Sequence, residues 1–310
     1  MPSSLEQLKQ WSVVVADTGD FEQIQQFRPQ DATTNPTLIL KASQQEIYRE
    51  FCRSVTQGAL NIREAVQQLL LHFGLEILKL IPGRVSIEVD ARLSFDTNGM
   101  IDDAKQLITY FSQHGIDRER ILIKIAATWE GILAAQALEK EGISTNLTLV
   151  FSLAQAMICG RAKVRLISPF VGRILDWHQQ HSDVVYDSES DPGVLSVRQI
   201  FDHYKKQGYG TQIMAASFRN VGEILALAGC DLLTISPKFL LELQKSDATV
   251  SRRLSVPDRP LESSDPLEWK ESEFRLWIVN DAMACEKLYE GIRQFCRDAE
   301  ALEELIQRGF

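Results

Sequence analysis

Seven short β-rich runs of the sequence each contain or directly precede one polar residue. These residues are Asp17, Asn35, Glu88, Lys124, Thr148, Ser168 and Ser217. A polar or charged group is costly to bury unless it is hydrogen-bonded or paired. The seven positions are therefore the first candidates for a site that performs chemistry.

Lys124 is the sharpest of these candidates because isoleucine stands on both sides of it in Ile121–Ala126. Burial disfavours the ammonium form of lysine, and a neutral amine forms a Schiff base with a ketone or an aldehyde. An isolated lysine more often lies on an exposed strand face with its ammonium in solvent. The apolar flanks and the polar residues of neighbouring runs favour the buried nucleophile.

Asp17 and Glu88 supply two carboxylates for the proton transfers that Schiff-base chemistry requires. A second interpretation exists for each of them. Asp17 opens the sequence Asp-Thr-Gly-Asp, which is typical of a helix cap or a turn. Glu88 has Arg84 and Arg92 nearby in the sequence, and either could form an ion pair with it.

Two arginines follow the ends of expected strands and precede expected helices. Arg173 and Arg219 each come shortly after a strand-end serine, Ser168 and Ser217 respectively. A helix N-terminus beside an arginine is a natural anion site, and barrel enzymes often bind phosphate near their last strands. These residues predict a phosphate site; the alternative for each arginine is an ordinary surface salt bridge.

Patterns of a metal site, a histidine-based triad or a disulfide framework are missing from the sequence. None of the five histidines follows an expected strand or forms an HExxH pattern, and the five cysteines are widely spaced without a CxxC pair. We therefore expect no metal, and reduced thiols in a cytoplasmic protein.

The charge balance and the hydropathy argue against two further classes of protein, those that bind nucleic acid and those that span a membrane. The net charge is -9 and the pI is about 5.2, whereas a nucleic-acid surface needs a basic face. No apolar run approaches the roughly 20 residues of a membrane span, and the N-terminus lacks a signal-peptide pattern. We expect no nucleic-acid or membrane partner, and an anionic ligand must be met by local arginines or lysines.

The polar residues must be positioned by the elements that carry them, and eight strands are expected. They are 12–16, 31–34, 85–89, 121–125, 146–151, 165–168, 212–216 and 232–235, short runs rich in Val, Ile and Thr. Helical patterns lie between these strands, at 44–57, 62–80, 104–114, 131–140 and 221–228. The last three helices are each followed by a glycine that could end them, at Gly115, Gly142 and Gly229.

Eight strand–helix units in series indicate a parallel sheet that closes into a (β/α)8 TIM barrel. A doubly wound open sheet would usually place a glycine-rich phosphate loop after its first strand, and residues 17–20 form no such loop. In a barrel, catalytic residues lie at the carboxyl ends of several strands. We expect residues 1–310 to form one domain, with a polar loop at about 246–273 and a helical tail at about 274–310. Within the tail, Leu288, Ile292, Phe295 and Cys296 mark one apolar face.

Several long motifs resemble those of the classical, longer transaldolases, and they occur in the family's order. The segment Asp31–Ile39, DATTNPTLI, resembles the family's DATTNPSL signature, and Ile121–Ile132, ILIKIAATWEGI, resembles its active-site lysine signature. Further similar segments are VVVADTGD at 13–20, EVDARLSFD at 88–96, NLTLVFS at 146–152, ISPFVGRILDW at 167–177 and ASFRN at 216–220.

This resemblance implies a (β/α)8 barrel with extra N- and C-terminal helices and the lysine on the fourth strand. It implies transfer of a dihydroxyacetone unit from sedoheptulose 7-phosphate to D-glyceraldehyde 3-phosphate, giving D-erythrose 4-phosphate and D-fructose 6-phosphate. This is a step of the non-oxidative pentose phosphate pathway and needs no cofactor. The family also implies a homodimer.

The resemblance assigns a role to each matching residue. Lys124 would form the imine, Asp17 would exchange a proton with the substrate hydroxyl, and Glu88 would activate a water held with Thr148. The sugar would be lined by Thr33, Asn35, Asn146, Ser168 and Phe170, and the phosphate held by Arg173, Ser217 and Arg219.

The sequence departs from the family pattern at two places without a role in the chemistry. Ala127 replaces a usual serine, and residues 161–165 are unusually basic. Two alternatives to the transaldolase remain. One is a fructose 6-phosphate aldolase, which would release free dihydroxyacetone from the same imine. The other is a non-catalytic sugar-phosphate sensor, in which loss of Lys124 or of a carboxylate would be expected.

Overall fold

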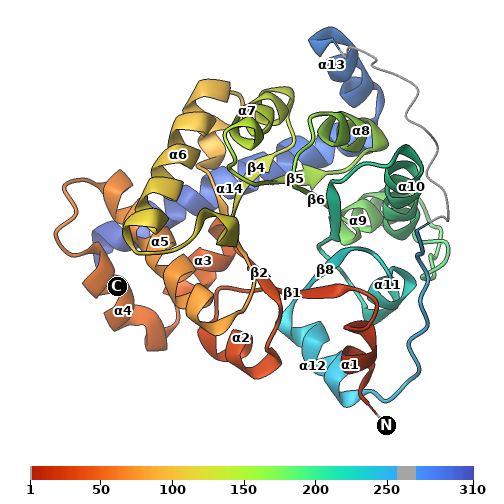
Figure 1. Ribbon diagram of the computed structural model, residues 1–310, viewed down its shortest axis with the longest axis horizontal. Coiled ribbons are helices and arrows are strands. Elements are labelled where there is room, and N and C mark those ends of the chain that lie inside the picture. Colours follow the sequence, from red (N-terminus) through yellow and green to blue (C-terminus); the bar gives the residue numbers. More distant parts are fainter. Residues whose placement is uncertain (1, 257–269) are drawn as a thin grey trace.

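The computed structural model describes residues 2–256 and 270–310, and its centre is a closed barrel of eight parallel strands (Figure 1). Each strand pairs with its sequence neighbours, and β8 pairs with β1. The strands are β1 (Val13–Asp17), β2 (Asp31–Thr33), β3 (Val85–Glu88), β4 (Ile121–Ala126), β5 (Thr145–Val150), β6 (Leu166–Pro169), β7 (Gln212–Ala215) and β8 (Leu232–Ile235). The predicted (β/α)8 barrel is confirmed, with Lys124 on the fourth strand.

The strand register decides which side chains share the barrel interior, because paired residues of neighbouring strands point to the same side. Near the amino ends of the strands, the interior is closed by one apolar cluster, formed by Val15, Leu122, Leu166, Met214 and Leu232. Two residues further along β1 and β4 lie Asp17 and Lys124. The interior therefore changes from apolar to polar toward the carboxyl ends of the strands.

Helices surround the barrel and bury their apolar faces against the outside of the strands (Figure 1). They are α2 (Phe21–Phe27), α3 (Pro36–Ser43), α4 (Arg49–Thr56), α5 (Ile62–Leu80), α6 (Thr97–Gln113), α7 (Trp129–Lys140), α8 (Leu153–Arg161), α9 (Gly172–His181), α10 (Pro192–Gln207), α11 (Val221–Ala226) and α12 (Pro237–Lys245). Single 3-10 turns are η1 (Glu46–Tyr48), η2 (Ala91–Leu93) and η3 (Arg118–Arg120).

Local side chains determine where several of these helices begin. Asn35 caps α3 and is followed by Pro36 at the first helical position, and Ser152 caps α8 in a capping box with Gln155. The predicted start of the helix at Ala104 is wrong, because Asp96 caps α6 and the helix begins at Thr97. The prediction followed apolar periodicity, which is weak in the first turns of α6.

The predicted helix at 44–57 is also wrong as a single element. Gln45 is extended, and the chain forms η1 before α4 begins at Arg49. The closing glycines were predicted correctly: Gly115, Gly142 and Gly229 all have positive φ angles, which glycine adopts without steric cost.

Additional helices flank the barrel at both ends of the chain. The short α1 (Ser4–Leu8) precedes β1, and the tail forms α13 (Glu271–Asn280) and the long α14 (Ala282–Arg308). Helix α14 contacts α3, α5, α9, η2 and β5, so it lies across the carboxyl ends of the strands on one side of the barrel (Figure 1). Its predicted apolar face is buried at Leu288, Ile292 and Phe295 and half-buried at Cys296.

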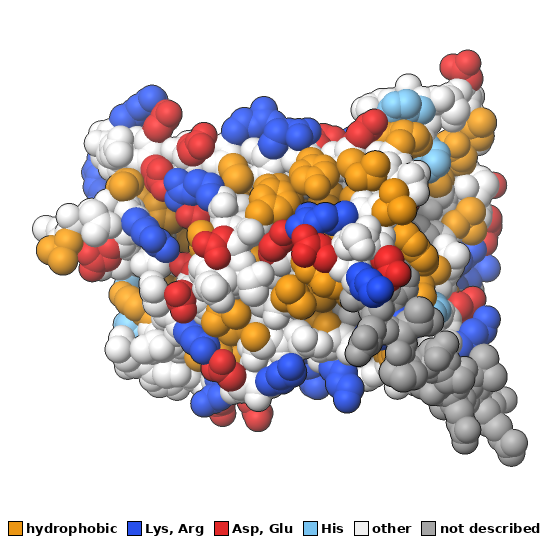
Figure 2. Space-filling view, turned by 90° about the horizontal axis from the view of Figure 1, so that it is seen from above, with side chains coloured by type: hydrophobic (Ala, Val, Ile, Leu, Met, Phe, Trp, Pro, Cys, Tyr) orange, Lys and Arg blue, Asp and Glu red, His pale blue; other side chains and the backbone are white. Residues whose placement is uncertain are grey.

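The predicted polar loop at 246–273 is confirmed only where the structure describes it. Residues 246–256 form neither helix nor strand, residues 257–269 lie outside the described residues, and α13 already begins at Glu271. On the side of the molecule in Figure 2, acidic and basic side chains are interspersed with apolar ones. No helix in the described part of the chain is long and apolar enough to cross a membrane.

Candidate active site

Lys124 and Glu88 form a buried ion pair at the polar end of the barrel interior. They are direct partners in the register of β3 and β4, and Lys124 Nζ lies 3.1 Å from Glu88 Oε2. The lysine is 4% exposed and Glu88 is 7% exposed. Lys124 Nζ also donates a hydrogen bond of 3.2 Å to the carbonyl oxygen of Thr34. The alternative of an exposed lysine is therefore wrong.

The alternative ion pairs for Glu88 are wrong as well, because both nearby arginines have other partners. Arg84 pairs with Asp31 at 2.8 Å, and Arg92 pairs with Asp90 and Glu303. Burial raises the pKa of Glu88, and the charge of Lys124 opposes this rise. Glu88 is thus a carboxyl group prepared to exchange a proton with the amine beside it.

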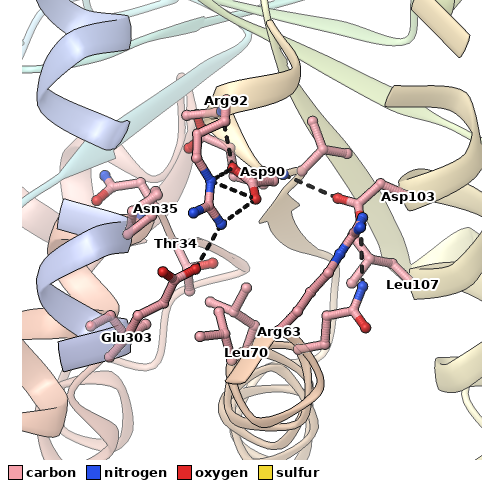
Figure 3. Close-up of a pocket in the computed structure, with 17 residues that line it drawn as sticks. Thr34, Asn35, Arg63, Leu70, Asp90, Arg92, Asp103, Leu107 and Glu303 are labelled. Carbon is pink, nitrogen blue, oxygen red and sulfur yellow. Dashed lines mark hydrogen bonds and ion pairs between the residues drawn. The ribbon is translucent and has the colours of Figure 1, made fainter. Parts of the chain in front are cut away.

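A small cavity of about 50 Å³ outside the barrel is lined in part by Glu88 and Asn35 (Figure 3). It lies between α5, α6 and α14. Figure 3 shows Arg92 at its edge, with ion pairs to Asp90 and Glu303 that join η2 to α14. Asn35 also caps α3 through a hydrogen bond from the backbone of Leu38 to its Oδ1, so its amide orientation is fixed.

Asp17 ends β1 and is the second carboxyl group of the barrel interior. Burial raises its pKa, while Lys124, Arg173 and Lys41 act in the opposite direction. The cap alternative is wrong for this residue, because Asp20 caps α2 by accepting from the backbone of Gln23. The carboxylate of Asp17 is therefore not used to cap α2.

Neutral polar residues from β2, β5 and β6 complete the interior. Asn146 donates to Ser86 Oγ at 3.1 Å and accepts from Ser168 Oγ at 2.6 Å. By contrast, the buried hydroxyls of Thr33 and Thr148 have no hydrogen-bond partner within residues 2–256 and 270–310. Because a buried hydroxyl without a partner is costly, both are available to a substrate or a water.

Two aromatic rings lie beside the first of the two arginines, and one of them is also near the lysine. The guanidinium of Arg173 stacks 4.9 Å from the ring centre of Phe170 and 5.8 Å from that of Phe295. Phe295 belongs to α14, and its ring centre is 5.7 Å from Lys124 Nζ. Burial and the charge of Arg219 lower the pKa of Arg173, which forms no ion pair in the described part of the chain. The alternative of a surface salt bridge is therefore wrong for Arg173 within the described residues.

The second arginine lies on the loop that follows β7. Ser217 has a φ of 63°, and its carbonyl oxygen accepts from the backbone of Gly172 at 2.8 Å. A Cβ at Gly172 would overlap Ser217 and the side chain of Arg219, so glycine allows the loop to approach the start of α9. Arg219 Nη1 lies 3.3 Å from Ser217 Oγ. The salt bridge that was the alternative for Arg219 is present, because Arg219 pairs with Asp176. This pairing leaves Nη1 directed at Ser217.

Sequence reasoning missed several groups of this site. Thr234 on β8 is a register partner of Val15, so it faces the interior, and its buried hydroxyl has no partner among the described residues. Side chains of a strand point alternately to its two faces, so the run Leu232–Ile235 could have indicated Thr234 as an interior residue. Phe295 could be predicted only as part of the apolar face of the tail, because an apolar residue in a helix is usually a packing residue. Ser86 could have been found as the polar residue two positions before Glu88.

Metal ligands do not gather anywhere in the described residues, where no group of three or more His, Cys, Asp or Glu side chains is placed to hold an ion. All five cysteines are free thiols. The chemistry that the described side chains offer is that of an amine, two carboxyl groups and neighbouring hydroxyls.

Two buried carboxyl groups, Glu223 and Asp191, lie beneath the loop of Arg219. Glu223 accepts from the backbone of Arg219 at 2.7 Å and from Asn220 at 3.2 Å, and it shares a hydrogen bond with Asp191. Burial, with the charge of Asp191, raises the pKa of Glu223 from its ordinary 4.5 to about 7. Burial also raises the pKa of Asp191, while hydrogen bonds from the backbone of Val194 and Gly193 act in the opposite direction.

This pair predicts a decline in stability with rising pH. Between pH 4.5 and about 7 the folded protein keeps a proton that the unfolded chain has released, so unfolding becomes easier as pH rises through that interval. Glu223→Gln imitates the protonated acid and should reduce this decline. Melting temperatures at pH 5.5 and pH 8 measure this decline in the wild type, in Glu223→Gln and in the exposed control Glu242→Gln. A decline in Glu223→Gln equal to that of the wild type would contradict the raised pKa of Glu223.

A comparison with known protein families agrees with this geometry. The model of the family described as Transaldolase/Fructose-6-phosphate aldolase matches residues 14–306. This range includes all eight strands, apart from the first residue of β1, and most of α14.

Proposed function

This chain belongs to the transaldolase/fructose-6-phosphate aldolase family, and we propose that it is a transaldolase acting through a Schiff base on Lys124. It would transfer a dihydroxyacetone unit from sedoheptulose 7-phosphate to D-glyceraldehyde 3-phosphate, giving D-erythrose 4-phosphate and D-fructose 6-phosphate. The observation that carries this proposal is the buried Lys124–Glu88 pair in an interior that also contains Asp17.

In the proposed first step, Lys124 attacks the ketose carbonyl as a neutral amine. The proton of its ammonium passes to Glu88, whose raised pKa makes it a suitable acceptor. The carbinolamine then loses its hydroxyl as water, with Glu88 returning a proton to the leaving oxygen. Thr148, whose hydroxyl has no partner among the described residues, would hold this water. Hydrolysis of the imine is the reverse sequence.

Asp17 would act in the carbon–carbon bond step. It takes the proton from the hydroxyl on the fourth carbon, the bond between the third and fourth carbons breaks, and an aldehyde leaves. The electron pair remains on the three-carbon fragment, delocalised into the imine on Lys124. An acceptor aldehyde then forms the new bond and recovers the proton from Asp17. The imine serves as the electron sink, so the proposed reaction requires no cofactor.

Arg173, Ser217 and Arg219 would bind the substrate phosphate. Arg219→Ala should raise KM for a phosphorylated ketose by roughly 10- to 100-fold, because a charge-assisted hydrogen bond is lost. Steady-state kinetics with fructose 6-phosphate and with fructose measure the effect. An equal loss of kcat/KM for the unphosphorylated sugar would refute the role in phosphate binding.

Transfer is distinguished from the aldolase alternative by the fate of the three-carbon fragment. Helix α14 covers part of the barrel opening and places Phe295 near Lys124, an arrangement that would shield the carbanion from protonation. A coupled assay with fructose 6-phosphate, with and without erythrose 4-phosphate, tests the proposal. Turnover should depend on the acceptor; equal release of dihydroxyacetone without acceptor would favour the aldolase.

We further propose that the protein acts in the cytoplasm as a homodimer, in the non-oxidative pentose phosphate pathway. A sensor without catalysis is disfavoured, because the lysine and both carboxyl groups are present and lie in one interior.

A further inference from the structure

Arg219 is fixed by contacts on its backbone and along one complete edge of its guanidinium. Its backbone N–H donates to Glu223, which is fully buried. On the guanidinium, Nε lies 3.0 and 3.2 Å from the two carboxylate oxygens of Asp176, and Nη2 lies 2.6 Å from Oδ2. Such two-point contact fixes the plane of the guanidinium as well as its position.

Nη1, on the other side of the guanidinium, faces the Ser217 loop, which includes a proposed phosphate ligand. Arg219 Nη1 points to the hydroxyl and the carbonyl oxygen of Ser217, both at 3.3 Å. The backbone of Ser217 is in turn held by Gly172 at the start of α9. Asp176 lies on the same helix, one turn after Arg173. Helix α9 thus supplies one phosphate ligand directly and orients the other through its carboxylate.

We infer that Asp176 is a positioning residue for phosphate recognition, which holds Arg219 by its Nε–Nη2 edge and leaves the Nη1 edge for the phosphate. The inference rests on the proposed function and deepens it, because it names the group that orients one of the proposed phosphate ligands. Asp176 itself does not touch the phosphate.

An ordinary surface salt bridge would contribute little, because exposed ion pairs cost side-chain entropy and are screened by solvent. This pair differs in geometry, since Arg219 is about 39% exposed at its side chain yet is held by Asp176, by the Ser217 loop and through its backbone by Glu223. Without Asp176 the long side chain regains its rotamers, and the phosphate must then order it on binding.

Binding of inorganic phosphate tests the inference directly and without catalysis. Titration calorimetry of the full chain should show phosphate binding that is roughly tenfold weaker in Asp176→Ala, as for loss of one charged contact. Asp176→Asn keeps the shape and one acceptor, so its loss should be smaller. In an Arg219→Ala background, Asp176→Ala should cause no further loss, because its effect passes through Arg219. The exposed Asp202→Asn is the matched control.

Kinetics separate this role from a merely structural one. Asp176→Ala should raise KM for fructose 6-phosphate while leaving kcat, and KM for fructose, unchanged. Phosphate binding that is unchanged or tighter in Asp176→Ala, or a further loss in the Arg219→Ala background, would overturn the inference. Should the wild type form no adduct on Lys124, the proposed function fails, while the phosphate titration still decides the role of Asp176.

Discussion

Lys124→Met is expected to reduce ketose turnover by at least about 10⁴-fold and to eliminate the covalent adduct that borohydride traps with fructose 6-phosphate. Removal of a nucleophile destroys the covalent route, so only the residual effect of substrate binding remains. The measurement is steady-state turnover combined with mass-spectrometric mapping of the trapped peptide. In the wild type the label should lie on the peptide that contains Lys124.

The fold should survive this substitution. Methionine has a similar length, and the site already contains the ring of Phe295 at 5.7 Å from the lysine nitrogen. Loss of the ammonium leaves Glu88 alone, but burial already raises the pKa of that carboxyl, so it becomes neutral instead of an unpaired charge. Lys205→Met is a suitable control because Lys205 forms a structural ion pair with Asp231. A trapped adduct on another lysine would sink the mechanism.

The barrel could be predicted from the sequence because each strand has its own local signal. Runs such as Ile121–Ala126 and Leu232–Ile235 are short and rich in β-branched residues, and glycines with positive φ follow several of the helices between the strands. The helix starts were predicted less well. Asp96 caps α6, which begins at Thr97, well before the predicted start at Ala104. A cap depends on one side chain rather than on a repeated pattern.

Candidate residues could be named individually, but their partners could not. Asp17 and Asp20 are both capable caps in the sequence, and only the backbone geometry shows that Asp20 performs this function. Glu88 has two arginines close in sequence, yet the strand register places it against Lys124. Contacts between distant segments, such as Asp176 with Arg219, leave no local pattern at all.

The two carboxyl groups of the interior differ in their distance from the amine, which suggests different tasks. Glu88 is in direct contact with Lys124 and suits the proton transfers at the nitrogen and at the leaving water. Asp17 is influenced by the lysine through its charge, and no described contact ties its carboxylate to Lys124. We therefore propose Asp17 for the proton transfer farther along the substrate chain.

This division predicts that Asp17→Asn will block carbon–carbon bond cleavage without blocking imine formation. Asparagine has the same shape but cannot accept the hydroxyl proton, so turnover should fall by roughly 10²- to 10⁴-fold. Lys124 and Glu88 remain intact, and borohydride should still trap an adduct. The mass of that adduct is informative: the intact six-carbon sugar phosphate should accumulate in the variant, whereas the wild type also yields the three-carbon fragment.

Glu88→Gln provides the matched comparison, because it removes the other carboxyl group. If Glu88 handles the water and the nitrogen, this variant should trap adduct slowly, and the adduct that forms should still contain the three-carbon fragment. A three-carbon adduct in Asp17→Asn at the wild-type proportion would show that another group takes the hydroxyl proton. The adduct masses therefore distinguish the two carboxyl groups by the step that each one serves, which turnover alone cannot do.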